Sequence, residues 1–125
     1  GVPYWVSTHL ARHVHAQPFI RSQRNDRQDE YDRNAARQDA PVDMIWYMNA
    51  EELMTIMEKR LCHLAAKETR KVAKKIRELV IEQCPEFVDL LAPPCVQTLV
   101  CREMYPCKYE NVLTWRVSYG NNSCD

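Results

Sequence analysis

The longest regular pattern of apolar residues runs through the middle of the chain, from about Asn49 to Gln83. Apolar side chains recur there every three or four residues, the period of one helical face: Leu53, Ile56, Met57, Leu61, Leu64, Val72, Ile76 and Leu79. Asn49 is a favourable N-cap, and Glu52 three residues later completes an approximate capping box. The pattern predicts a helix ended by Pro85, with a kink or break near His63 because it is longer than most globular helices.

The N-terminal segment shows shorter and more varied patterns. Residues 2–6 are β-branched or aromatic and predict a strand. Ser7 and Thr8 predict the cap of a short helix that reaches about His15 and ends before Pro18. Its apolar face would hold Val6, Leu10 and Val14. Alternation over residues 19–24 then predicts a second strand, which places Ile20, Ser22 and Arg24 on one face.

The remaining segments are a polar stretch, an apolar stretch and a proline-rich tail. Residues 25–39 are almost wholly polar with no period, which favours a solvated loop, whereas residues 41–48 predict a buried strand. Residues 84–125 predict irregular structure with a final strand over 112–119. We therefore expect an α+β fold, a small mixed or antiparallel sheet packed on a long helix, in one domain: a core (1–83) and a cysteine- and proline-rich tail (84–125).

Composition narrows the class of protein. The chain has 125 residues with an apolar fraction of 46%, as in a globular domain. Its formal net charge is zero, and nucleic-acid binders usually show a basic excess. It contains neither an apolar run long enough to cross a membrane nor a secretion signal. We expect a cytoplasmic protein that binds neither nucleic acid nor membrane.

Glycine is scarce, and this limits how the chain could bind phosphate. Only Gly1 and Gly120 are present, so neither a Walker loop nor a Rossmann glycine motif can form. Phosphate recognition would have to use side chains, and the planar guanidinium of arginine suits it best.

Arg60 is the most unusual charge in the sequence. On a helical wheel it falls among Leu53, Met57 and Leu64, where a charge is costly unless it is paired. Two interpretations stay open. Arg60 either pairs with Glu68 or extends to solvent, or it is an arginine held at a ligand pocket.

A second group of polar residues surrounds Pro18. Arg12, His13 and His15 precede the proline, and Ser22 and Arg24 follow it. A metal site made of His9, His13 and His15 fits the spacing poorly, so a surface histidine cluster is the simpler interpretation. Ser22 lacks the surroundings of a hydrolytic nucleophile.

The cysteines of the tail could be used in three ways. Cys84, Cys95, Cys101 and Cys107 are separated by ten, five and five residues, wider than the usual pairs of zinc ligands. They are weak candidates for zinc, the other choices being reduced buried thiols and disulfides. Cys62 is expected in the helix core.

These motifs resemble the flavin-dependent thymidylate synthase family. Arg12-His13-Val14, seven residues, then Ser22-Gln23-Arg24 is similar to the family signature. Arg37, Pro41, Asn49, Arg60 eleven residues after Asn49, and the stretch from Ala65 to Arg70 follow in the family's order. The resemblance covers about residues 4–80, and the tail looks like that of a short, cysteine-bearing branch found in phages and clostridia.

The resemblance implies the fold, the activity and the site residues. It implies a homotetramer that methylates deoxyuridine monophosphate (dUMP) to dTMP, with methylenetetrahydrofolate as the carbon donor and NADPH reducing FAD. By position, Arg24 and Arg37 would bind the phosphate, Arg60 would meet the uracil, and Ser22 would lie at the nucleotide. Arg60 and Ser22 would be the catalytic residues. Arg12, His13 and Asn49 would lie at the flavin.

Three positions depart from the family pattern. Val14 replaces an arginine, Ile20 replaces a glutamate that contacts the nucleotide, and Ala66 replaces a glutamine. The N-terminal part that completes the family fold is also missing, as in a truncated member. An alternative is therefore a noncatalytic nucleotide-binding or interaction domain without flavin, and another is a small zinc-stabilised module.

Overall fold

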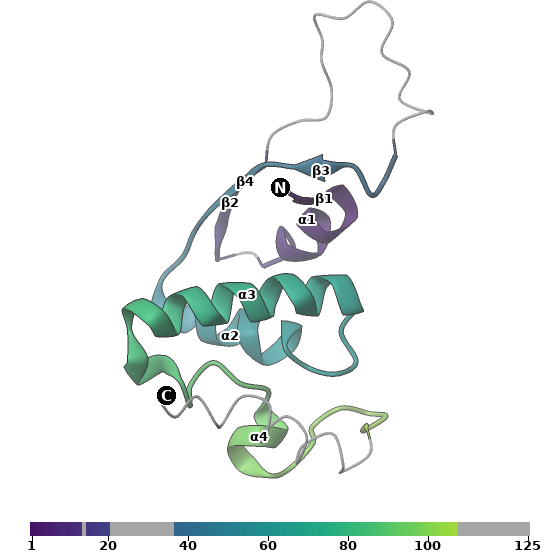
Figure 1. Cartoon of the computed structure of the whole chain (residues 1–125). Coiled ribbons are helices and arrows are strands. Elements are labelled where there is room, and N and C mark those ends of the chain that lie inside the picture. Colours follow the sequence, from purple (N-terminus) through teal and green to yellow (C-terminus); the bar gives the residue numbers. More distant parts are fainter. Residues whose placement is uncertain (14, 21–36, 108–125) are drawn as a thin grey trace, which may run out of the picture. The chain divides into compact units, whose positions relative to one another are not determined.

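The structure, a computed structural model, describes residues 1–13, 15–20 and 37–107. The chain divides into two compact units, Gly1–Glu52 and Leu53–Asp125. Figure 1 labels their helices and strands. The expected α+β class is confirmed at this level, because short antiparallel sheets and helices occur together.

The first unit begins with a strand that leads directly into a helix. Strand β1 (Val2–Pro3) pairs antiparallel with β3 (Pro41–Val42), and α1 (Tyr4–Leu10) follows β1. The backbone N–H groups of Tyr4 and Trp5 donate to the carbonyls of Ala40 and Gln38 at 3.0 and 3.1 Å. Residues 38–40 thus satisfy donors that the first turn of a helix leaves without an intrahelical acceptor.

A second sheet consists of β2 (Gln17–Ile20) and β4 (Met44–Tyr47), which pair antiparallel. Phe19 pairs with Ile45, and both side chains are exposed; Pro18 pairs with Trp46 on the other, half-buried face. In a two-stranded sheet every strand is an edge. Proline, which lacks a backbone donor, is therefore tolerated in β1, β2 and β3.

Several predictions for the first unit need correction. The strand ends at Pro3 and the helix begins at Tyr4, so Ser7 and Thr8 do not cap it. Their hydroxyls donate instead to the carbonyls of Tyr4 and Trp5, three residues back. The helix ends at Leu10 rather than near His15. Val6 and Leu10 are buried as expected, but Val14 lies outside the described residues.

The predicted second strand and the predicted buried strand are only partly right. Pro18 does not separate a helix from a strand but lies inside β2, and residues 21–24 are outside the described part. The stretch 41–48 divides into β3 and β4, and Ile45 and Tyr47 are 64% and 66% exposed. The apolar composition therefore reflects one exposed face as well as one covered face. Of the predicted loop, residues 37–39 are an exposed turn, and the rest is not described.

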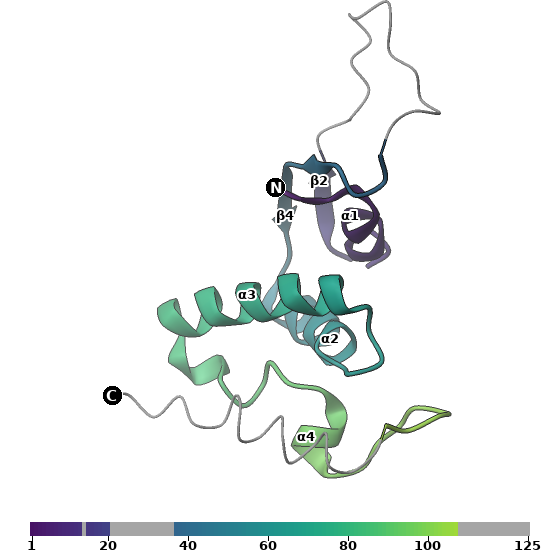
Figure 2. The ribbon, with the colours of Figure 1, turned by 45° about the vertical axis from the view of Figure 1, so that its right-hand side comes forward.

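The predicted long helix is two helices, with the break where it was expected. Helix α2 (Ala50–Arg60) and helix α3 (Lys67–Gln83) flank an irregular connection, and they lie side by side in Figures 1 and 2. The Arg70 guanidinium donates to the carbonyl of His63 at 2.6 Å and more weakly to that of Ala65. This side chain stabilises the connection by satisfying carbonyls that leave the helical ladder.

The covered face of α3 is not the predicted one. Thr69, Ala73 and Arg77, four residues apart, are buried, whereas Leu79 is 50% exposed. Val72 and Ile76 are half-buried at the edge of this face. The prediction counted apolar residues and therefore could not place an arginine at the centre of the stripe.

The segment after α3 is mostly irregular, as expected. It contains a short 3-10 helix η1 (Pro85–Phe87) and α4 (Pro94–Thr98), which ends at Leu99 in the left-handed region with φ of 61°. Residues 99–107 contain no helix or strand. The predicted strand over 112–119 lies outside the described residues.

Candidate functional site

His13 lies in a turn after α1, in a polar cluster of the first unit. Its Nδ1 is 3.9 Å from a carboxylate oxygen of Glu52, and both side chains are about nine-tenths buried. The ring of Trp46 lies 6.3 Å from the His13 ring, centroid to centroid. The buried Trp46 Nε1 has no hydrogen-bond partner among the described residues. This cluster combines a histidine, a carboxylate and an orphan N–H donor.

An orphan buried donor is costly and therefore informative. A buried N–H without an acceptor costs about 1–3 kcal/mol, so native structures usually supply a partner. A ligand with carbonyl or ring-nitrogen acceptors would satisfy Trp46 Nε1. Sequence reasoning placed His13 at a site but missed Trp46 and Glu52, because both lie more than 30 positions from His13 in the chain.

Arg37 lies at the start of the turn whose carbonyls accept hydrogen bonds from the first backbone N–H groups of α1. Its guanidinium donates twice to the Asp39 carboxylate, Nε to Oδ1 at 2.8 Å and Nη2 to Oδ2 at 2.6 Å. Both side chains are exposed. The hydrogen bond from Arg37 lowers the pKa of Asp39 below its ordinary value and raises that of Arg37. The Arg37 guanidinium is thus exposed to solvent, and another anion can replace Asp39 as its partner.

Asn49 begins α2. Its side-chain oxygen accepts a hydrogen bond from the backbone N–H of Glu52 at 2.8 Å, which confirms the predicted N-cap. The side chain's second polar group, the amide nitrogen, is a donor that a ligand could use.

Arg60 is the last residue of α2 and is half-buried beside the buried side chains of Met57 and Leu61. Leu64, expected on the same helical stripe, lies beyond the helix end and is 54% exposed. Glu68 belongs to α3 and is also exposed, so the two charges do not share one helix face. In the last turn, Arg60 complements the negative end of the α2 dipole.

The structure does not describe every predicted site residue. Arg12 is exposed in the turn after α1, whereas Ser22 and Arg24 lie outside the described residues. His9 contacts the Trp5 ring edge-on at 5.3 Å, and the described residues hold no cluster of three metal-ligating side chains.

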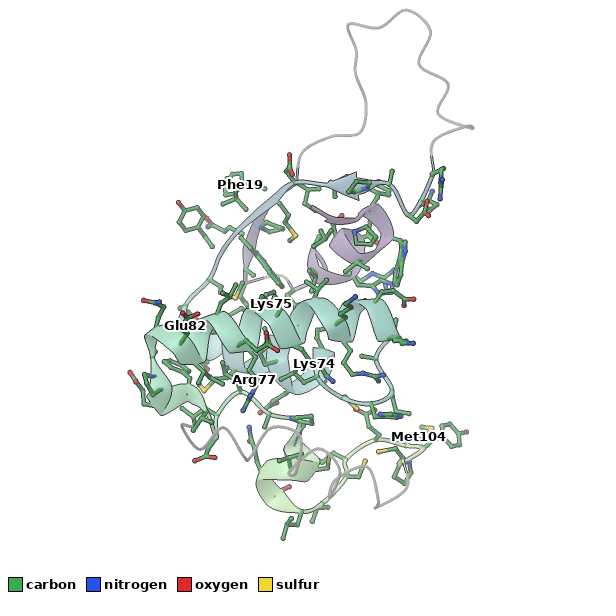
Figure 3. All side chains as sticks on the ribbon, in the orientation of Figure 1. Phe19, Lys74, Lys75, Arg77, Glu82 and Met104 are labelled. Carbon is green, nitrogen blue, oxygen red and sulfur yellow. The ribbon has the colours of Figure 1, made fainter. Side chains whose placement is uncertain are left out.

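Arg77 is a buried charge that sequence reasoning missed. It is 1% exposed, and its Nε and Nη2 donate to the carbonyls of Leu91 and Val88, both at 2.8 Å. Burial lowers its pKa from the ordinary value, while Asp89 and Glu78 oppose this effect. Figure 3 labels Arg77 on α3. Its hydrogen bonds to the segment after α3 give Arg77 a structural role. The sequence signal that could have indicated its burial is its spacing, since Arg77 follows Thr69 and Ala73 at intervals of four residues.

A comparison with protein-family models gives a match to the central part of the chain. Residues 25–86 match the family described as thymidylate synthase complementing protein. Over this segment the chain is similar to the flavin-dependent thymidylate synthase family. The matched residues include Arg37, Asn49 and Arg60, so the resemblance predicted from those motifs is confirmed there. The synthase match begins after Arg12, His13, Ser22 and Arg24.

The other comparisons add no further relative of this synthase family. Searches of the curated proteins and of the solved structures give no significant match. No helix in the described ranges is long and apolar enough to span a membrane.

Proposed function

We propose that the chain acts as a flavin-dependent thymidylate synthase, converting dUMP to dTMP with methylenetetrahydrofolate and NADPH. The observation that supports this most is the family match over residues 25–86, a range that contains Arg37, Asn49 and Arg60. In this proposal the enzyme is a cytoplasmic homotetramer. The reduced flavin supplies the hydride, and the side chains of this chain bind and orient the nucleotide.

Arg37 is proposed to bind the nucleotide phosphate, together with Arg24. Its guanidinium already makes a double hydrogen bond with one carboxylate, Asp39, in an exposed turn. A phosphate dianion offers the same two-oxygen geometry with more negative charge, so it can displace Asp39. Solvent exposure keeps the Arg37–Asp39 pair weak and makes this exchange easy.

Arg60 is proposed to contact the uracil, with Ser22 nearby at the nucleotide. The guanidinium lies at the end of α2, next to buried apolar side chains that exclude water. A lower local dielectric strengthens its interaction with a carbonyl oxygen or with negative charge that develops on the ring.

The cluster around His13 has donors that fit the flavin. An isoalloxazine ring carries several carbonyl and nitrogen acceptors, and the orphan Trp46 Nε1 is a buried donor of the required kind. Arg12, His13 and the amide nitrogen of Asn49 are the other proposed donors. Glu52, close to His13 Nδ1, would fix the orientation of the imidazole.

The test is the visible spectrum of the purified protein, first alone, then with FAD, then with dUMP. Flavin bands that remain with the protein through gel filtration and shift on addition of dUMP would support the proposal. Loss of all flavin on gel filtration, even after incubation with excess FAD, would contradict it.

A noncatalytic nucleotide-binding domain is the second candidate. Two observations favour it: the family match begins after the Arg12–Arg24 signature, and Ile20 lines an apolar groove where the family has a glutamate. The lining residues are Pro18, Phe19, Ile20, Asp43, Met44 and Ile45. Calorimetric binding of dUMP by a protein that retains no flavin would establish this alternative.

A further inference from the structure

The two-stranded sheet of β2 and β4 has two outer edges, and the register shows which backbone groups lie on them. Pro18 pairs with Trp46 in this antiparallel sheet. Because Pro18 has no backbone N–H, this pair cannot be one of those that exchange two hydrogen bonds, and such pairs alternate along the sheet. The backbone N–H and C=O groups of Trp46, and those of Met44 two residues earlier, therefore point away from β2.

Only β4 has an outer edge that can fully pair with another strand. The outer edge of β2 lacks one donor, since it contains Pro18. Strand β4 reads Met-Ile-Trp-Tyr, without the proline or charged residues that usually protect an edge strand. Among the described helices and strands, β2 is the only strand paired with β4 and the only element that packs extensively against it. The edge of β4 is thus a template for a further strand.

The face of the sheet beside this edge is apolar and uncharged. The side chains of Phe19, Ile45 and Tyr47 are 60%, 64% and 66% exposed, and the rings of Phe19 and Tyr47 meet edge to face at 6.3 Å. Figure 3 shows the Phe19 side chain projecting away from β2. The fourth residue of this face is Gln17, which pairs with Tyr47 and carries no charge. A face without charge does not repel a copy of itself, so a second copy of the same strand fits this edge.

We propose that β4 pairs antiparallel with β4 of a second copy of this chain, which joins the two sheets into one. A two-fold axis relates the copies, so the contact is self-complementary and closes as a dimer. Met44 of each copy exchanges two backbone hydrogen bonds with Trp46 of the other. Ile45 lies opposite Ile45 of the second copy, and Asp43 lies opposite Tyr47. The two Asp43 carboxylates therefore do not face each other.

The length and the faces of β4 set this register. A shift by one residue would bring the exposed side chain of Ile45 opposite a residue of the half-buried face. A shift by two residues would require hydrogen bonds from Met48, which lies beyond the end of β4. Because so short an edge buries far less than the about 800 Å² per partner of a standard interface, the dimer is weak and depends on concentration.

The first experiment measures self-association of the full chain by sedimentation velocity from about 1 to about 300 μM. It uses neither flavin nor nucleotide, so its outcome is independent of the proposed synthase activity. We expect the wild type to associate with rising concentration. Met44→Pro removes an outward donor in each copy and should weaken association at least about tenfold.

Ile20→Pro is the matched control for Met44→Pro. Ile20 is the cross-strand partner of Met44, and its N–H points outward on the opposite edge, that of β2. This variant should associate as the wild type does. A wild type that stays monomeric over the whole range, unchanged association in Met44→Pro, or an equal loss in both variants would overturn the proposal.

A second experiment tests the register without removing a backbone donor. Ile45→Lys and Ile45→Glu place like charges opposite each other across the two-fold axis, so each variant alone should be monomeric. A 1:1 mixture should associate again, because opposite charges then meet. No association in the mixture beyond that of either variant alone would show that Ile45 does not lie at the axis.

Phe19 provides the control for this charge exchange. It lies on the same exposed face as Ile45 but in β2, away from the proposed contact. Phe19→Lys and Phe19→Glu should therefore each associate as the wild type does. Loss of association in both, with recovery in their mixture, would show that the copies meet face to face and not along the edge of β4.

Discussion

At the scale of single residues, two arginines show how the same type of side chain can have opposite roles. The Arg37 guanidinium lies in solvent with an exchangeable carboxylate partner, whereas that of Arg77 is buried against two backbone carbonyls. Arg37 can therefore change partners when an anion binds, and Arg77 cannot do so without exposing polar groups to an apolar environment. Sequence position suggested the role of Arg37, but the burial of Arg77 depends on residues 11 and 14 positions later.

The Arg37–Asp39 pair leads to a prediction with two variants of opposite effect. Asp39→Asn removes the competing negative charge and should tighten dUMP binding about two- to fivefold, whereas Arg37→Ala should weaken it about tenfold. Isothermal titration calorimetry at low ionic strength measures both affinities. An unchanged affinity in Arg37→Ala would remove this residue from the phosphate site.

For Arg60, we predict that Arg60→Ala weakens dUMP binding by at least about a hundredfold while α2 stays folded, because a half-buried charged contact is lost. Lys59→Ala is the matched control, since Lys59 is the exposed neighbour in the same helical turn. Calorimetry gives the affinities and far-ultraviolet circular dichroism reports the helix. If Arg60→Ala binds dUMP as the control does, the proposed contact with uracil is excluded.

At the scale of elements, local signals predicted the helix termini that depend on local contacts. The Asn49 cap and the break near His63 were both predicted, because capping and helix length are read from neighbouring residues. The start of α1 was not predicted. Its first N–H groups are satisfied by Gln38 and Ala40, more than 30 residues away, and no local pattern encodes that contact.

Asn49 has two separable roles that substitutions can distinguish. Asn49→Ala should lower the free energy of unfolding by about 1 kcal/mol, whereas Asn49→Asp should keep the cap and change it little. Aspartate, when ionised, cannot donate a hydrogen bond, so both variants should retain less flavin. Urea unfolding and the flavin content after gel filtration measure the two effects. Full flavin retention by Asn49→Asp would mean that Asn49 serves only as a helix cap.

At the scale of the whole molecule, the α+β class and the synthase resemblance followed from the sequence, whereas distant contacts did not. The approach of His13 to Glu52 joins residues more than 30 positions apart. Apolar periodicity says which residues are covered, but it contains no information on which distant side chains meet. The site residues proposed from motif order therefore depend on the binding experiments above.

The bonds between Arg77 and the segment after α3 should contribute strongly to stability. Arg77→Met replaces the guanidinium by an unbranched apolar side chain and leaves the Val88 and Leu91 carbonyls without their donors. This variant should lower the free energy of unfolding by about 3 kcal/mol. Lys75→Met is the control, because Lys75 is exposed and makes a surface ion pair with Glu78 at 3.2 Å. It should change stability by no more than about 0.5 kcal/mol. Urea unfolding compares the two; equal losses would contradict the structural role of Arg77.

The position of these carbonyl acceptors also has a consequence for synthesis on the ribosome. Translation proceeds at about 5–20 residues per second, so the Arg77 guanidinium precedes its last acceptor, Leu91, by about one to three seconds. During that interval α3 exists only as a nascent helix that exposes its future buried face. A pause in translation after Arg77 has emerged from the ribosome, but before Leu91 has emerged, would prolong this state and make the nascent chain a better substrate for chaperones and proteases.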